Sequence, residues 1–155
     1  MKRTAKPARA YALCALMLAT LAAPVAANDF ALSPVFVGAA YKWGVSINGG
    51  AVQQNPTLVL IRGQTYTFEV TGLAPIHSFY IKTASSTGTL NAYSGGGLSA
   101  NGIMTDTTLG MPITFTVPQT APNTLFYNCG LHASMAGRIT IDGIFQNGFE
   151  TPPTL

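Results

Sequence analysis

The chain has 155 residues, of which 48% are hydrophobic and only 8% are charged, and its formal net charge is +3. The positive excess comes from four basic residues in the first ten positions, namely Lys2, Arg3, Lys6 and Arg9. The rest of the chain carries four basic against five acidic side chains, a net charge of −1, which argues against a nucleic-acid-binding or polybasic membrane-binding protein.

The first 27 residues have the three parts of a secretory signal peptide. The basic head is followed by an apolar run over about residues 11–23, then by Pro24 and the small-residue sequence Val25-Ala26-Ala27. This run is too short for a membrane-spanning helix, which needs about 20 residues. We therefore expect cleavage after Ala27, no membrane span in the mature chain, and a periplasmic or secreted location.

Beyond residue 27, apolar and polar residues alternate, a pattern that predicts half-buried strands. In TYTFEVT (65–71), for example, Tyr66, Phe68 and Val70 share one face. Turn-forming residues separate the strands, and no window has the 3.6-residue period of a helix. We expect strands at residues 33–39, 41–48, 57–62, 65–71, 77–83, 112–118, 124–129 and 137–142. Seven or eight short strands predict an all-β fold, an antiparallel Greek-key sandwich or barrel.

These strands predict a single domain over residues 28–142, which is long enough to bury a proper core. Residues 84–111 interrupt the strands with a stretch rich in Gly, Ser, Thr and Asn. Such a long connection within a compact domain is usually functional or mobile. Residues 143–155 contain Pro152 and Pro153 and are expected to form a flexible C-terminal tail.

Three side chains that can bind metal stand three residues apart in YNCGLHASMAG (127–137), namely Cys129, His132 and Met135. Cys14 leaves with the signal peptide, so Cys129 is the single cysteine of the mature chain, which suggests an intermolecular disulfide or a reactive or metal-bound thiol. The only other histidine, His77, is expected on the inward face of its strand. A thiolate, two imidazoles and a distant thioether are the ligands of a type 1 copper site. We therefore predict one copper ion bound by these two histidines, the cysteine and the methionine.

Two other uses of these side chains stay open on chemical grounds. A Cys–His nucleophile would need an exposed thiol beside an oriented base, and it would leave Met135 without a role. A structural zinc ion could use Cys and His ligands, although copper binds such sites more tightly and Met is a poor ligand for zinc.

The spacing Cys-x2-His-x2-Met at residues 129–135 resembles the ligand loop of the cupredoxins, in the short form found in amicyanin. NPTLVLIRGQTYTFEV (55–70) resembles the strand pair before their first ligand, and HSFYIKT (77–83) their first-histidine strand. The likeness covers about residues 41–142. It implies a mononuclear blue copper protein that carries single electrons between redox partners. Two positions depart from the family pattern, because Ser78 stands where Asn is common and Gly130 where Ser or Thr is usual.

The resemblance also bears on the kind of activity. Copper nitrite reductases and multicopper oxidases are related proteins, but they need more histidines than the two in this chain, so we do not expect an enzyme. We expect a monomer whose redox partner docks near His132 and Leu131, on an apolar face completed by Ala133, Pro75 and Ile76.

The alternative function is a periplasmic or extracellular copper-binding carrier, or a metal-stabilised structural module, with no role in electron transfer. A copper-delivering protein would more often show several spare methionines or histidines at an open site. Here only Met104 and Met111, in the long connection, could serve as such spare ligands.

Overall fold

The structure is a computed structural model, and it describes residues 28–107 and 112–142. The predicted signal peptide, Met111 and the predicted tail lie outside these residues. Within them, no helical segment is long and apolar enough to span a membrane. The described residues form nine strands: β1 (Asn28–Val37), β2 (Ala40–Ile47), β3 (Gln53–Gln54), β4 (Leu58–Ile61), β5 (Thr65–Val70), β6 (Phe79–Lys82), β7 (Ile113–Thr116), β8 (Thr124–Cys129) and β9 (Ala136–Asp142).

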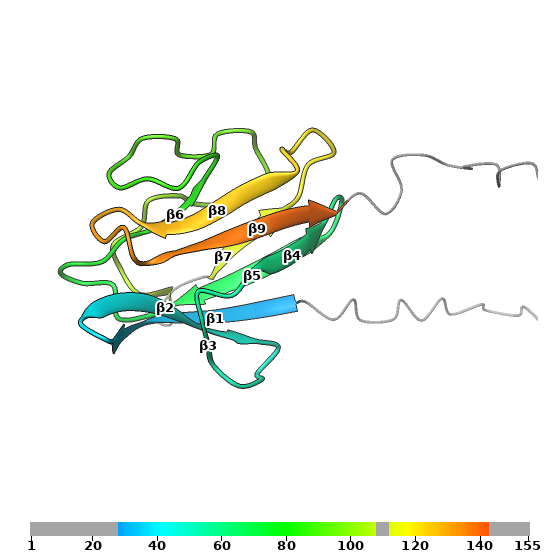
Figure 1. Ribbon diagram of the computed structural model, residues 1–155. Coiled ribbons are helices and arrows are strands. Elements are labelled where there is room, and N and C mark those ends of the chain that lie inside the picture. Colours follow the sequence, from blue (N-terminus) through cyan, green and yellow to red (C-terminus); the bar gives the residue numbers. More distant parts are fainter. Residues whose placement is uncertain (1–27, 108–111, 143–155) are drawn as a thin grey trace, which may run out of the picture.

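The strands form two sheets that pack face to face (Figure 1). One sheet has the order β3-β2-β1-β5-β7 and the other has the order β4-β9-β8-β6. Large apolar side chains from both sheets fill the space between them, among them Trp43, Phe68 and Phe79, each at most 1% exposed. The predicted all-β sandwich is therefore confirmed, because burying one face of each sheet against the other removes these rings from water.

The alternation seen in the sequence matches the observed burial. Along β5, Tyr66, Phe68 and Val70 are buried, whereas Thr65 and Glu69 are exposed. Each predicted strand overlaps an observed one, although β1 begins at Asn28 rather than at Ser33, and the two-residue strand β3 was not predicted.

Two strand pairs differ from the antiparallel pairing that the sequence led us to expect. Strand β1 runs parallel to β5, with Asn28 opposite Tyr66, and β4 runs parallel to β9, with Leu58 opposite Ile139. Both pairs join segments far apart in the chain, and such pairing leaves no trace in local alternation. The remaining strand pairs within the described residues are antiparallel.

The described part of the long connection, residues 84–107, is tied to the edge of β6. The Lys82 ammonium is fully buried and donates hydrogen bonds to the carbonyls of Ser86 (2.8 Å) and Gly88 (2.6 Å). The Asn101 side chain accepts from the Ile81 N–H (2.8 Å) and donates to the Ile81 carbonyl (2.9 Å). The alternation places Lys82 on the face opposite Ile81, and this connection buries that face.

Three turns lie together at one end of the sandwich, on the left in Figure 1. They are the turn between β1 and β2, the connection between β5 and β6, and the turn between β8 and β9. The last two contain His77, His132 and Met135, and Cys129 ends the strand β8 beside them.

Candidate metal centre

Strand pairing brings the first histidine to the cysteine. Strands β6 and β8 are antiparallel neighbours, and Phe79 lies opposite Cys129, the last residue of β8. His77 precedes Phe79 by two residues, so it lies on the same side of the sheet as Cys129. His132 and Met135 follow in the short turn before β9 begins at Ala136.

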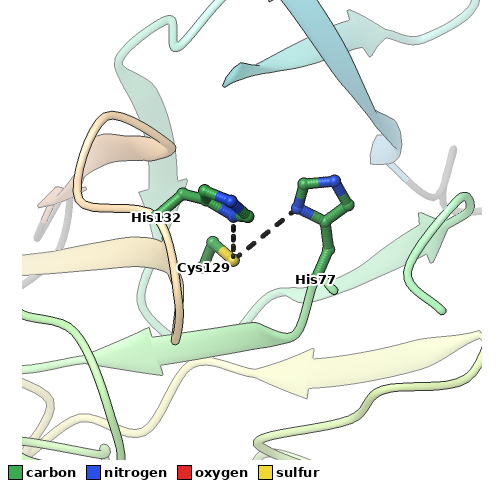
Figure 2. Close-up of side chains that lie close together, drawn as sticks. All are labelled: His77, Cys129 and His132. Atoms are coloured by element: carbon green, nitrogen blue, oxygen red, sulfur yellow. Dashed lines mark hydrogen bonds between the residues drawn. The ribbon is translucent and has the colours of Figure 1, made fainter. Parts of the chain in front are cut away.

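The structure places the three strongest candidate ligands around one point. The Cys129 sulfur is 3.6 Å from Nδ1 of His132 and 4.0 Å from Nδ1 of His77, as Figure 2 shows. The three ligand atoms all lie within 4.8 Å of one another. In the part of the chain that the structure describes, this is the one group of three or more His, Cys, Asp or Glu side chains close enough to hold a metal ion. The set of donors, one thiolate and two imidazoles, fits copper in a type 1 site.

The three residues differ in how far they are exposed to solvent. Cys129 is 0% exposed and His77 is 4% exposed, whereas His132 is half-buried. A Cys–His nucleophile needs an exposed thiol, so the burial of Cys129 argues against that interpretation. The half-buried imidazole of His132 is the ligand with access to the surface.

Burial also favours the metal-binding form of His77. Loss of solvent, and to a lesser extent the nearby His132, lower the pKa of His77 from its usual range. A neutral imidazole is the form that binds a metal ion. The site therefore favours the ligand-competent state of this histidine.

Met135 is held by its backbone beside these ligands. Its side chain is 0% exposed, its N–H donates to the His132 carbonyl (3.0 Å), and its carbonyl accepts from the Cys129 N–H (2.8 Å). These bonds fold the turn back on the end of β8. The role of Met135 as an axial ligand stays a prediction.

The two departures from the family pattern fit each other in space. The Gly130 N–H donates to Ser78 Oγ at 3.0 Å, so the serine braces the residue after the cysteine. A Cβ atom at Gly130 would lie 2.6 Å from that same oxygen and 3.0 Å from Cε2 of Tyr80. A Ser or Thr at position 130 would therefore require the Ser78 side chain to move. The loop is thus braced by a Ser–Gly pair.

The cysteine end is also tied to the long connection. The Gly130 carbonyl accepts from the Gly88 N–H (2.6 Å), and the Asn128 side chain donates to Ser85 Oγ (3.1 Å). The sulfur itself accepts from the Leu131 N–H at 3.4 Å, a contact that stabilises a thiolate. The described part of the long connection therefore supports the strand that ends in Cys129.

Tyr41, at the start of β2, contacts the site from the opposite sheet and was not predicted. Its ring centroid lies 4.7 Å from that of His77 and 5.2 Å from that of His132. On its other side it packs edge-on against Phe36, at 5.0 Å. The strand YKWGVSIN (41–48) was recognised in the sequence, but nothing in it shows that the tyrosine meets histidines 36 and 91 positions away.

A scan against models of known protein families finds no match, and no curated protein sequence matches the chain. Among solved structures, rusticyanin from Thiobacillus ferrooxidans is similar at 23% identity, with 74% of this chain and 76% of that chain covered and a TM-score of 0.45. A structure of reduced rusticyanin is similar at 23% identity, with 74% and 78% covered and a TM-score of 0.44. A variant of the McoA multicopper oxidase from Aquifex aeolicus is similar at 15% identity, with 74% and 26% covered and a TM-score of 0.41.

These sequence identities and TM-scores are too low to support a statement about function. The function is therefore argued from the residues of the site. The fold is an all-β sandwich of two packed sheets. Two packed sheets hold a buried cysteine at the end of β8, one histidine before the neighbouring strand β6, and a second histidine in the turn to β9. The donor set expected from the ligand-loop sequence is therefore brought together by the fold, in an arrangement consistent with one type 1 copper site.

Proposed function

We propose that this protein is a mononuclear type 1 copper protein that carries single electrons between redox partners. The observation that supports this most is the convergence of one cysteine and two histidine ligand atoms within 4.8 Å. His77, Cys129 and His132 would hold the ion, with Met135 as a weak axial ligand. A copper ion bound there supplies a reversible one-electron change between Cu(II) and Cu(I).

The chain's own residues make the site rigid and keep it from solvent. His77 and Cys129 are fixed by neighbouring strands, and Ser78 braces Gly130. Because the protein sets these positions through its fold, little needs to move when the charge at the site changes. Burial of the thiolate also keeps competing ligands and oxidants away.

A docking face around His132 fits a transient redox partner. Three large apolar side chains near the site are exposed, namely Leu131 (58%), Ile76 (44%) and Phe36 (65%). Leu131 and Ile76 adjoin the two histidines in the chain, and Phe36 reaches them through the Tyr41 ring. Phe36 is an addition to the face expected from the sequence. With a net charge of −1 after signal removal, long-range steering is weak, so partner choice rests on this apolar contact.

Export forms part of the same proposal. The signal-peptide pattern of residues 1–27 supports a periplasmic or secreted protein, and a monomer suits a small shuttle. We propose a carrier and no enzymatic activity, because both histidines are already used as ligands and none is left for a second, catalytic copper.

The first test is an absorption spectrum of the purified protein during titration with Cu(II). One equivalent should produce an intense blue band from thiolate-to-Cu(II) charge transfer, and an excess of Zn(II) should not displace the copper. A colourless protein, or equal preference for zinc, would reject the copper site.

The second test separates an electron carrier from a copper carrier. Reduced protein is mixed with candidate oxidised cytochromes in a stopped-flow instrument, and copper transfer to an apo-acceptor is measured in parallel. Electron exchange much faster than copper release supports the proposal. Copper transfer without electron exchange would assign the protein to copper delivery instead.

A further inference from the structure

Asn55 lies where the chain crosses from one sheet to the other. It follows the short strand β3 of the five-stranded sheet and precedes β4 of the four-stranded sheet by three residues. Its side-chain oxygen accepts from the Trp43 N–H (2.8 Å), and its side-chain nitrogen donates to the Ser134 carbonyl (2.9 Å). The Asn55 side-chain amide therefore joins β2 to the ligand loop, where Ser134 lies 79 residues after Asn55 in the chain.

The carbonyl that Asn55 holds belongs to the peptide unit between Ser134 and Met135. The N–H of the same unit donates to the His132 carbonyl at 3.0 Å. Both polar groups of this peptide are thus paired, one within the turn and one with the opposite sheet. Because the plane of this peptide sets the direction in which the Met135 backbone continues, Asn55 constrains where the methionine side chain begins.

A second contact from the same sheet acts on the same residue. The Ser134 hydroxyl donates to the Tyr41 carbonyl at 2.8 Å. The Tyr41 ring packs against the rings of both His77 and His132. Strand β2 and Asn55 together therefore cover the turn that contains His132 and Met135.

The chemistry of position 55 points to asparagine in particular. The backbone φ is +44°, a left-handed conformation that asparagine tolerates better than most residues. The position also needs one acceptor, for Trp43, and one donor, for Ser134, and the amide supplies both. Aspartate would keep the shape and the acceptor, but it would turn a carboxylate oxygen towards the Ser134 carbonyl.

We propose that Asn55 is a positioning residue for the methionine half of the copper site. It fixes the Ser134–Met135 peptide from the opposite sheet, so that the turn is held in its ligand-binding shape before copper arrives. This inference rests on the proposed copper site. It assigns a role in that site to a residue outside the ligand loop and outside the first-histidine strand.

The experiment compares Asn55→Asp with Gln54→Glu. Both variants convert an amide to a carboxylate at adjacent positions, but Gln54 is exposed and its side chain makes no contact with the ligand loop among the bonds of the described residues. We expect Asn55→Asp to weaken copper affinity by about 10–100-fold, the usual effect of losing an outer partner of a metal ligand. Gln54→Glu should stay within about twofold of the unmodified protein.

A measurement on the copper-free protein tests positioning directly. Amide hydrogen exchange at Met135 should speed up by about tenfold in Asn55→Asp, because the turn opens more often when its anchor is lost. Exchange in the β8–β9 ladder should not change, since those amides are bonded strand to strand. Local acceleration with weaker copper binding supports the inference.

Three outcomes would reject the positioning role of Asn55 or the proposed copper site on which it rests, and the measurements distinguish them. If Asn55→Asp matches Gln54→Glu in both affinity and Met135 exchange, the positioning role is wrong. If exchange rises equally throughout the ladder, Asn55 is a general turn residue and the role is again wrong. If the unmodified protein takes up no copper, the proposed function fails, and the positioning role fails with it for that separate reason.

Discussion

At the cysteine end of the ligand loop, support comes from the loop's own sheet, whereas at the methionine end it comes from the opposite sheet. Gly130 is braced by Ser78, and a Cβ atom at Gly130 would force the Ser78 hydroxyl to move. Ser134 is instead held by hydrogen bonds to Tyr41 and Asn55. The cysteine end is held by close packing as well as by hydrogen bonds, while the support of Ser134 from across the sandwich consists of hydrogen bonds that can be removed one at a time. We therefore expect changes at the cysteine end to decide whether the site forms, and changes at the methionine end to adjust its properties.

The largest effect should come from Cys129→Ser, which should abolish the blue absorption completely. A hydroxyl of similar size keeps the packing but supplies no thiolate for charge transfer and is a poor ligand for copper. His77→Ala and His132→Ala should also abolish the blue site, because the trigonal ligand set loses a member. The absorption spectrum after Cu(II) addition checks this, with circular dichroism as the control for folding. A variant that stays blue would show that another residue supplies the charge-transfer ligand.

The next effect concerns the packing at the cysteine end. Gly130→Ala places a methyl group 2.6 Å from Ser78 Oγ, and we expect a loss of about 1–3 kcal/mol in the free energy of unfolding, typical of overpacking. Copper affinity should fall as well, because the clash moves the residue next to Cys129. Chemical denaturation and copper titration measure the two quantities.

A double variant sharpens this prediction. Ser78→Ala removes the oxygen that the new methyl group would meet, so Ser78→Ala/Gly130→Ala should be more stable than the sum of the two single changes implies. Strict additivity would contradict a steric fit between the two positions. The loss would then have to come from backbone conformation at residue 130.

Sequence reasoning succeeded where the controlling contacts are local. The alternation in TYTFEVT follows from the two-residue repeat of a strand, and the spacing of Cys129, His132 and Met135 lies within one turn. Both features can be read from a few consecutive residues. The sequence was therefore sufficient for the all-β class and for placing Cys129 beside His132. His77 lies 52 residues from Cys129 and was expected at the site only from the chemistry of the ligand set and the inward face of its strand.

Sequence reasoning failed where the controlling contacts join distant segments. The parallel pairing of β1 with β5 depends on which strand lies beside which, and local alternation is the same for either direction. Burial of Lys82 depends on the connection that covers it, since the strand pattern gives only its side of the sheet. Tyr41 and Asn55 reach the ligand turn over long sequence separations, and the segments that contain them, 41–48 and 55–70, give no sign of these contacts.

At the methionine end, Met135→Leu should adjust the site without destroying it. Leucine has nearly the same volume, so the cost in stability should stay below about 1.5 kcal/mol. Loss of the weak thioether ligand destabilises Cu(II), so the reduction potential should rise by at least about 59 mV, a tenfold shift for a one-electron couple. Redox titration followed at the blue band measures this. An unchanged spectrum and potential would show that Met135 only packs the loop.

The smallest effect on the site itself should come from Leu131→Lys, because this side chain lies outside the ligand set. Leu131 is 58% exposed and directly precedes His132, so it is placed to touch a partner without shaping the bound ion. A lysine there adds a charge that must lose its water when an apolar partner docks, and we expect electron transfer to slow by roughly tenfold, equivalent to about 1.4 kcal/mol.

The matched control is Val59→Lys, since Val59 is equally exposed at 58% but lies on β4, in the sheet position next to β9 and outside the turns that form the site. Stopped-flow rates with one cytochrome should fall for the first variant only, while both keep the blue absorption. Equal slowing in both variants would mean that added charge acts on the whole molecule, and the partner would then have to dock somewhere other than over His132.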